Sequence, residues 1–343
     1  MHAGHTPPRM KLLFVGGTGN ISTSCSRLAL ELGHELWLLH RPGRPGIAGA
    51  RDLHCDIADE AAAAAALAPH RFDAVVQFIA FTPAQIERDL RLFAGRCGQY
   101  VFISSASAYA KPRTFAPTTE RTPLENPRWQ YSRDKIACEQ VLRAAGVAKL
   151  PYTIIRPSLT YDTVIPLPIG GWTDFTTVER MRRGQPVVVP GDGTSPWTIT
   201  HAEDFAPGLL GLLGNPAAYG EDFQITSDEA LTWDELYTQT AQAAGVAQPR
   251  LVHIPSELLV AWNPELEGTL LGDKSHPAIF DNTKLKRLVP GFRPRIAYRD
   301  GIRRTLAWFD ADPARRRLPP ENDGFIERLL AAYARAWPVG KLW

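Results

Sequence analysis

The sequence predicts an α/β protein built on a doubly wound parallel sheet, followed by a smaller C-terminal α/β domain. Between residues 10 and 157, apolar strand patterns alternate with helix patterns. The first of these strands runs directly into a glycine-rich turn. Beyond Pro157 the chain becomes rich in Pro, Gly and Trp and loses this alternation. We therefore expect a nucleotide-binding domain over 10–157 and a mainly substrate-binding domain over 158–343, parts of which return to the first sheet.

The elements follow in chain order. Met1–Arg9, with two prolines, is expected to be a disordered tail. Continuous apolar runs or short extended pieces predict strands at Lys11–Val15, at Glu35–His40, just before Asp56, at Ala74–Phe81 and at Tyr100–Ser104. Helix patterns start near Ile21 and occupy Glu60–Ala68, Gln85–Ala94 and the segment around Tyr131. Lys111–Arg128 contains four prolines and is expected to be a surface loop before that last helix.

Composition excludes several classes of function. The 38 basic and 36 acidic residues are interspersed, so we expect no nucleic-acid partner. The four cysteines are scattered without Cys/His ligand spacing, which predicts reduced thiols in a cytoplasmic protein and no metal site. No apolar run reaches the roughly 18 residues of a membrane span, and the first nine residues lack the apolar core of a signal peptide.

The glycine-rich turn has the sequence Gly16-Gly17-Thr18-Gly19-Asn20-Ile21-Ser22. Gly16 and Gly19 allow a tight turn through which backbone N–H groups approach a pyrophosphate, and the following helix points its positive end at the same charge. Ser22 takes the place of the usual third glycine, where a small side chain still permits close helix–strand packing. An ordinary βα loop is the alternative, but the flanking strand and helix favour a dinucleotide site.

Tyr131 and Lys135 stand four residues apart, which on a helix places a phenol and an ammonium on one face. A nearby fixed positive charge favours the phenolate and lowers the tyrosine pKa, so the pair can act as a base and its activator. By itself this spacing is more typical of a half-buried tyrosine beside a solvated lysine. A polar cluster, Ser104-Ser105-Ala106-Ser107, ends a predicted strand, and ligands of parallel sheets collect at such carboxyl ends.

Taken in order, the glycine turn, the serine cluster, Tyr131 and Lys135 resemble the extended branch of the short-chain dehydrogenase/reductase superfamily, the NAD-dependent epimerase/dehydratase family, whose fold is of the Rossmann type. Gly191-Asp192-Gly193, His201–Asp204 and Asp281–Phe292 add to the resemblance. It implies that Tyr131 is the catalytic acid/base, that Lys135 binds the nicotinamide ribose and lowers the tyrosine pKa, and that Ser105 hydrogen-bonds the reacting substrate oxygen. It also implies a homodimer, because the tyrosine-bearing helix often packs at a subunit interface.

The same resemblance implies a set of cofactor-binding residues: Gly16, Thr18, Gly19, Asn20, Ile21, Arg41, Asp56, Ile57, Ala80, Lys135 and Pro157. No acid that would hold an NAD ribose follows the second strand, where the sequence is His40-Arg41-Pro42-Gly43-Arg44. Arg41 or Arg44 can pair with a 2′-phosphate, so NADP is modestly favoured over NAD. Two solvated loop arginines are the alternative.

Four positions depart from the family pattern. Ala106 and Ser107 replace the acid pair of the sugar-nucleotide dehydratases, so dehydration is disfavoured. Trp197 stands where the epimerases carry an arginine for the substrate diphosphate, and Leu159 stands where they carry an asparagine. Arg183 and its neighbours Arg180 and Arg182 are candidate replacements, although a solvated basic helix face is the more typical interpretation. The candidate substrate residues are Ser107, Trp197 and Arg183.

The expected activity is that of an NAD(P)-dependent epimerase or oxidoreductase acting on a hydroxyl of a sugar-like small molecule, such as a nucleotide-sugar or nucleoside, through a transient keto intermediate. Two alternatives stay open. One is an NADPH-dependent reductase of a small carbonyl compound. The other is a non-catalytic RNA-binding member, since the family includes the chloroplast stem-loop-binding proteins, although near-neutral charge disfavours it.

Overall fold

A computed structural model describes residues 9–112 and 116–336, so all but Arg9 of the predicted N-terminal tail lies outside the described residues. Its centre is a seven-stranded sheet with the order β11-β6-β5-β4-β1-β2-β3, in which every pair of neighbours is parallel. The strands are β1 (Lys11–Val15), β2 (Glu35–His40), β3 (Arg51–His54), β4 (Phe72–Gln77), β5 (Cys97–Ile103), β6 (Tyr152–Pro157) and β11 (Asp222–Ile225). The predicted doubly wound α/β sheet is confirmed.

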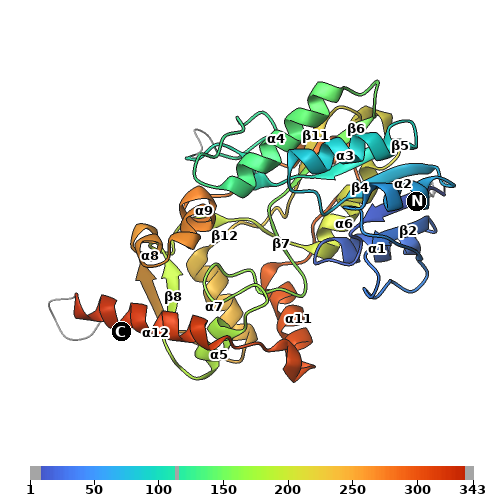
Figure 1. Cartoon of the computed structure of the whole chain (residues 1–343). Coiled ribbons are helices and arrows are strands. Elements are labelled where there is room, and N and C mark those ends of the chain that lie inside the picture. Colours follow the sequence, from blue (N-terminus) through green and yellow to red (C-terminus); the bar gives the residue numbers. More distant parts are fainter. Residues whose placement is uncertain (1–8, 113–115, 337–343) are drawn as a thin grey trace.

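Helices cover both faces of this sheet, as Figure 1 shows. Successive side chains of a strand point to opposite faces, so Leu12 and Phe14 of β1 pack with helices on one side and Leu13 and Val15 on the other. The first face carries α1 (Ser22–Glu31) and α6 (Ala202–Leu212), and the second carries α2 (Glu60–Leu67), α3 (Pro83–Phe93) and α4 (Gln130–Ala145). The resulting two apolar layers hold the strand ends, and hence the site, in fixed positions.

Local sequence explains where the helices start. Asp59 caps α2 by accepting a hydrogen bond from the backbone N–H of Ala62, and Thr82 with Gln85 forms a capping box before α3. The strand expected at Ala74–Phe81 instead ends at Gln77. The buried amide of Gln77 donates to Asp89 and accepts from the N–H of Ile79, which turns the chain out of the sheet.

The second half of the chain forms a smaller body beside the sheet, seen at the lower left of Figure 1. It contains two-stranded ladders, β7 with β10, β9 with β12, and β8 with β13. Their bounds are β7 (Leu159–Tyr161), β8 (Val187–Pro190), β9 (Pro196–Trp197), β10 (Ile199–His201), β12 (Leu231–Thr232) and β13 (Leu251–Ile254). Its helices are α5 (Thr176–Arg182), α7 (Trp233–Ala243), α8 (Ser256–Trp262), α9 (Glu267–Thr269), α11 (Tyr298–Asp310) and α12 (Pro320–Arg335). α10 (Thr283–Leu288) packs instead against β11 and α6 of the large sheet.

The two halves are interleaved rather than sequential. β7 to β10 leave the sheet, but α6 then packs on α1 and β11 adds a strand to the free edge of β6. The smaller body keeps its own apolar layers, one of which contains Phe175, Trp233 and Phe309. Residues on both sides of position 157 therefore contribute to the nucleotide-binding sheet.

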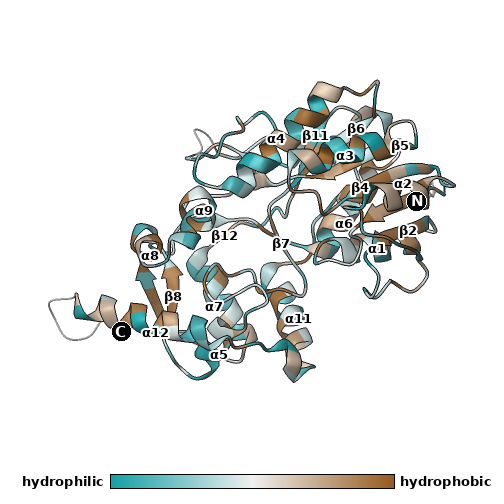
Figure 2. Ribbon diagram, in the orientation of Figure 1, coloured by the Kyte–Doolittle hydropathy of each residue, from teal (hydrophilic) through white to brown (hydrophobic). Residues whose placement is uncertain are grey.

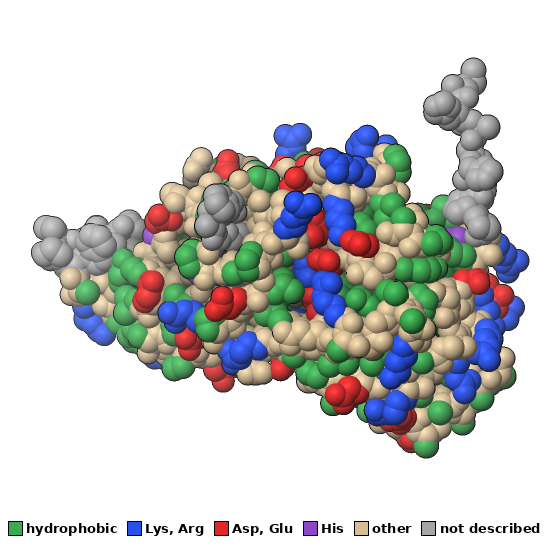
Figure 3. All heavy atoms as spheres, turned by 90° about the horizontal axis from the view of Figure 1, so that it is seen from above, with side chains coloured by type: hydrophobic (Ala, Val, Ile, Leu, Met, Phe, Trp, Pro, Cys, Tyr) green, Lys and Arg blue, Asp and Glu red, His purple; other side chains and the backbone are tan. Residues whose placement is uncertain are grey.

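The distribution of hydropathy and charge separates an apolar interior from a charged surface. Strands such as β2 and β8 are strongly hydrophobic, whereas the helices contain both hydrophobic and hydrophilic residues (Figure 2). Acidic and basic side chains are mixed over the face seen in Figure 3. Among the described residues no helix is long and apolar enough to cross a membrane.

Candidate active site

A cavity of about 600 Å³ lies between the carboxyl ends of the sheet strands and the smaller body. The sheet side contributes the glycine turn, the serine cluster, Tyr131 and Lys135. The opposite wall comes from the segment after β7, from β9 and from the region around residues 269–280. A position at the carboxyl edge of an open parallel sheet is where such folds bind their ligands.

The glycine turn fits a dinucleotide. Gly16 has a φ of 82°, and a Cβ there would lie 2.5 Å from Cγ2 of Ile79, so any side chain would both strain and block the turn. Helix α1 starts without a side-chain cap, which leaves N–H groups directed at the cavity. Ser22, in place of the third glycine, accepts from the N–H of Gly19 and donates to the carbonyl of Gly16. The buried Oδ1 of Asn20 has no hydrogen-bond partner among the described residues, which leaves an acceptor for a ligand.

Not all of the predicted cofactor residues line this cavity. Gly16, Gly19, Asn20, Ile21, Lys135 and Pro157 do, whereas Thr18, Arg41, Asp56, Ile57 and Ala80 are absent from the wall. Arg41 and Asp56 follow β2 and β3, two neighbouring parallel strands, so they lie at the same edge of the sheet beyond the cavity. Asp56 accepts from the N–H of Ala58, and Ala80 offers its carbonyl to Lys135.

Ser105 follows β5 and precedes a 3₁₀ turn, Ala106–Ala108 (η1). Its hydroxyl accepts from the N–H of Ser107 at 3.2 Å and lies 2.9 Å from the Ser107 hydroxyl. Ser132, next to Tyr131 on α4, donates to that same Ser107 hydroxyl at 2.7 Å. Ser105 also hydrogen-bonds the Tyr131 phenol. The predicted serine and tyrosine are therefore brought together, and Ser107 contributes by orienting Ser105.

Burial, rather than the lysine charge, dominates the electrostatics of Tyr131. Burial raises the pKa of Tyr131, the hydrogen bond from Ser105 opposes this shift, and the nearby carboxylate of Asp273 adds to it. Lys135 has its Nζ 5.8 Å from the Tyr131 ring centre and donates to the carbonyls of Ala80 and Ile103 at 2.7 and 2.8 Å. The lowering of the Tyr131 pKa by Lys135 stays a prediction. Burial also lowers the pKa of Lys135 to about 8.

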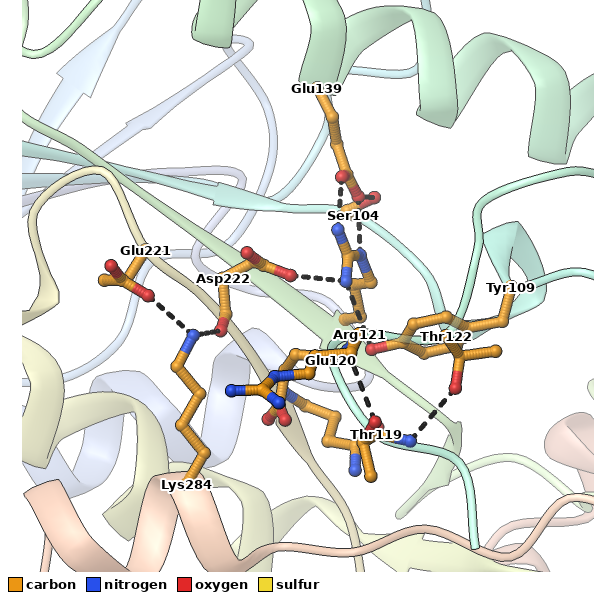
Figure 4. A network of polar contacts seen from close by, with 12 residues as sticks. Ser104, Tyr109, Thr119, Glu120, Arg121, Thr122, Glu139, Glu221, Asp222 and Lys284 are labelled. Atoms are coloured by element: carbon orange, nitrogen blue, oxygen red, sulfur yellow. Dashed lines mark hydrogen bonds and ion pairs between the residues drawn. The ribbon is translucent and has the colours of Figure 1, made fainter. Parts of the chain in front are cut away.

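A buried ion-pair network holds the helix that carries these residues. Glu139, one turn after Lys135, is 1% exposed and accepts from Ser104 Oγ at 2.6 Å. The guanidinium of Arg156 on β6 donates to both Glu139 oxygens, at 2.9 and 2.6 Å, and also to Asp222 on β11 at 2.6 Å. Figure 4 shows Glu139 pointing from its helix to Ser104, with Asp222 and Tyr109 nearby. Helix α4 is thus fixed to the strand end that presents Ser105.

The substrate side of the cavity is mainly aromatic and apolar. Trp129, Trp172, Trp197 and Phe280 line it together with Leu167 and two prolines. Trp197, predicted as a substrate residue, is among the residues that line the cavity. Trp172 is half exposed and has a φ of 65°, a left-handed conformation that is strained for a residue with a side chain.

The arginines proposed to bind a diphosphate do not reach this wall. Arg183 is exposed, pairs with Glu179 one turn earlier and does not line the cavity, so its role as a substrate residue stays a prediction that this geometry does not support. Arg180 is buried against Asp323 and Glu327. Within the described residues, the only charged side chains lining the cavity are Lys135, Asp273 and Lys274.

Sequence reasoning missed Asp273 and Lys274. They lie in a π-helical turn, Leu270–Lys274 (η4), far from the motifs in sequence. Glu139 was also missed, although its spacing from Tyr131 and Lys135, four residues per step, places all three on one helix face and could have revealed it. Among the described residues no cluster of metal-ligating side chains occurs.

The fold and the site together define a nucleotide-binding α/β protein with a Ser–Tyr–Lys set facing its cofactor turn. Residues 12–226 match the model of the NAD dependent epimerase/dehydratase family, and the chain belongs to this family. The predicted family is confirmed.

Known relatives of this chain differ in activity. It is 28% identical, over 83% of its length and 81% of the relative, to a 2'-dehydrokanamycin reductase of Streptomyces kanamyceticus. It is also 28% identical, over 71% of its length and 65% of the relative, to a chloroplast stem-loop binding protein of Arabidopsis thaliana. In fold it matches the UDP-glucose 4-epimerase of Bifidobacterium longum in complex with NAD+ and UDP, with a TM-score of 0.68, 20% identity and coverage of 88% and 98% of the two chains.

Proposed function

We propose that this chain catalyses NAD(P)-dependent hydride transfer at a hydroxyl-bearing carbon of a sugar-like small molecule, through a keto form of that carbon. The observation that carries the proposal is the hydrogen-bonded Ser105–Tyr131 pair, with Lys135 one turn further, in the same cavity as the uncapped start of α1. A non-catalytic fold does not require these three side chains in one cavity.

Each side chain has a defined role in the proposed reaction. In the oxidative direction, the Tyr131 oxygen takes the proton of the substrate hydroxyl, and the C–H bond of the same carbon breaks as a carbonyl forms. A nicotinamide held at the glycine turn would supply the hydride acceptor for oxidation and the hydride donor for reduction. Ser105 donates a hydrogen bond to the substrate oxygen, and Lys135 holds the floor of the cavity through the carbonyls of Ala80 and Ile103.

Whether the net reaction is epimerisation or reduction depends on whether the keto form leaves the cavity. The reductase from Streptomyces kanamyceticus and the aromatic wall without arginine favour net reduction of a carbonyl compound. Arg41 and the exposed Arg44 after β2 support NADP over NAD, although NAD is the cofactor named in the complex of the Bifidobacterium longum enzyme. A homodimer is part of the same proposal.

Tyr131→Phe tests the assignment because it removes the proton-transferring oxygen and keeps the ring. The purified protein is incubated with NADPH or NADH and a panel of keto sugars, and coenzyme oxidation is followed by absorbance. We expect the variant to lose activity by roughly 10²-fold or more while it still binds the coenzyme. An unchanged rate in the variant contradicts the proposal. Turnover without net coenzyme consumption identifies the epimerase form.

RNA binding is the second candidate, and the similarity to the chloroplast stem-loop binding protein is the observation that favours it. Mixed charge on the face in Figure 3 argues against it, because RNA affinity depends on many phosphate contacts. Titration of a stem-loop RNA at several salt concentrations tests this candidate. Tight binding with a steep salt dependence, unaffected by Tyr131→Phe, supports RNA binding over catalysis.

A further inference from the structure

The π-helical turn Leu270–Lys274 carries a carboxylate and an ammonium into the wall opposite the catalytic pair. Asp273 and Lys274 both line the cavity, and their side chains are only 10% and 12% exposed. π-Helical turns are rare and occur frequently at functional sites, because the widened turn re-aims the side chains it carries. We therefore expect this turn to contribute to ligand binding as well as to packing.

Several hydrogen bonds fix the turn relative to Ser105. The amide nitrogen of Asn126 donates to the carbonyls of Ser107 and Gly272, at 3.0 and 2.8 Å. Lys111 donates to the Ser107 carbonyl at 3.0 Å and pairs with Asp273 at 3.1 Å. One side of the turn is thus tied to the 3₁₀ turn that follows the catalytic serine. The polar groups of the π-helical turn are therefore held in a fixed position relative to Ser105.

Lys274 is the less satisfied of the two groups. Its Nζ lies 3.7 Å from Asp273 Oδ2, too far for a hydrogen bond, and 5.7 Å from the ring centres of Trp129 and Trp197. Among the described residues, this ammonium donates no hydrogen bond. This ammonium is largely buried, lies in the cavity wall beside two aromatic rings, and has N–H groups to which the described residues offer no acceptor. We therefore expect a ligand that accepts hydrogen bonds from it.

The charges on this wall limit the class of ligand that can bind there. Lys274 and Asp273 carry one charge of each sign on this wall, and Lys111 pairs with Asp273, so the cluster has a net charge of only +1. A nucleoside diphosphate brings about two negative charges that need several cations. A donor beside an acceptor instead matches neighbouring hydroxyl groups, each of which both donates and accepts. The flat faces of Trp129 and Trp197 match the C–H face of a saturated ring.

We propose that Asp273 and Lys274 determine specificity by binding neighbouring hydroxyls of an uncharged polyhydroxylated ring, a glycoside or cyclitol, rather than a nucleotide-diphosphate sugar. The inference rests on the proposed function for the reacting carbon and names the substrate class of that same site. The ring lies against Trp129 and Trp197, and its carbonyl or hydroxyl carbon faces Ser105 and Tyr131.

The test measures binding first and turnover second. NADPH-loaded protein is titrated calorimetrically with 2-keto-myo-inositol, with cyclohexanone as the same ring without hydroxyls, and with UDP-glucose. We expect the keto-inositol to bind best, and Lys274→Met to weaken it by roughly tenfold to a hundredfold, the usual range for a hydrogen bond to a charged group. Lys286→Met, on a partly exposed lysine that pairs with Asp228 outside the cavity, is the matched control and should change nothing.

The outcomes separate the two proposals. Tighter binding of UDP-glucose than of the keto-inositol, no keto-inositol binding, or equal affinity in wild type and Lys274→Met overturns the substrate class. Keto-inositol that binds through Lys274 but is never reduced refutes the hydride-transfer function and leaves the ligand assignment standing. Asp273→Asn, which keeps the side-chain shape, should reproduce the loss of affinity if the protein melts at the wild-type temperature. A normally folded Asp273→Asn protein with unchanged affinity contradicts the role of the carboxylate.

Discussion

Replacing the buried lysine of the site should change how stability depends on pH. Burial lowers the pKa of Lys135 to about 8 from its ordinary value of 10.5. The unfolded chain therefore binds more protons than the folded chain between these two values, and stability must rise with pH across that window. Below pH 8 the folded protein carries the full cost of a buried ammonium.

The magnitude follows from the two pKa values. A shift of one unit corresponds to 1.36 kcal/mol, so the lysine costs about 3 kcal/mol at neutral pH and about 1 kcal/mol at pH 10. Lys135→Met removes this titration. The free energy of unfolding of the wild type, measured relative to the variant, should therefore increase by about 2 to 3 kcal/mol from pH 7 to pH 10.

Urea unfolding at pH 7, 8, 9 and 10 measures this difference, and other titrating groups cancel to first order because both proteins contain them. Lys149→Met, on an exposed lysine, is the control and should show a difference that is flat with pH. A flat difference for Lys135→Met as well would refute the reasoning, since it would mean that the ammonium is no more costly in the folded protein than in water. The variant should also lose hydride transfer.

The remaining predictions concern the ion-pair network and the glycine turn. Glu139→Gln should lower the free energy of unfolding by about 3 kcal/mol, because Arg156 loses a buried carboxylate partner. Adding Arg156→Met should restore part of the lost stability. Thermal melting of the single and double variants checks both expectations. Gly16→Ala should abolish coenzyme binding in calorimetry, because the methyl group would lie 2.5 Å from Ile79. Gly33→Ala shares the positive φ but meets nothing within 4 Å, and should bind coenzyme normally.

Sequence patterns predicted what depends on neighbours along the chain. The strand Glu35–His40 and the turn after Val15 lie where the apolar runs and glycines placed them. The predicted strand that includes Ala74 was longer than the observed one. A run of apolar residues does not show that the Gln77 side chain donates to Asp89 and accepts from the N–H of Ile79, which turns the chain out of the sheet. Tertiary hydrogen bonds of this kind decide element ends.

The substrate wall could not be predicted in the same way. Asp273 lies far along the chain from Tyr131, and only the packing of the smaller body on the sheet brings its carboxylate near the phenol. Arg183 had the right chemistry for an anion, but its partner Glu179 lies one turn away on the same exposed helix face. Residue type and spacing identify pairs that lie close together in the sequence, such as Tyr131 and Lys135. The direction in which a remote side chain points depends on the whole fold.

The return of β11 to the sheet determines how this chain can be divided. A fragment ending at Pro157 would leave β6 as an edge strand paired only with β5, and all six of its residues are buried in the full chain. It would also remove Asp222 from the Arg156 guanidinium. Exposed apolar edges promote pairing between copies and aggregation. The chain up to Pro157 is therefore not expected to fold as an independent unit. A chimera that exchanges substrate-binding halves within the family must keep β11 together with the N-terminal part.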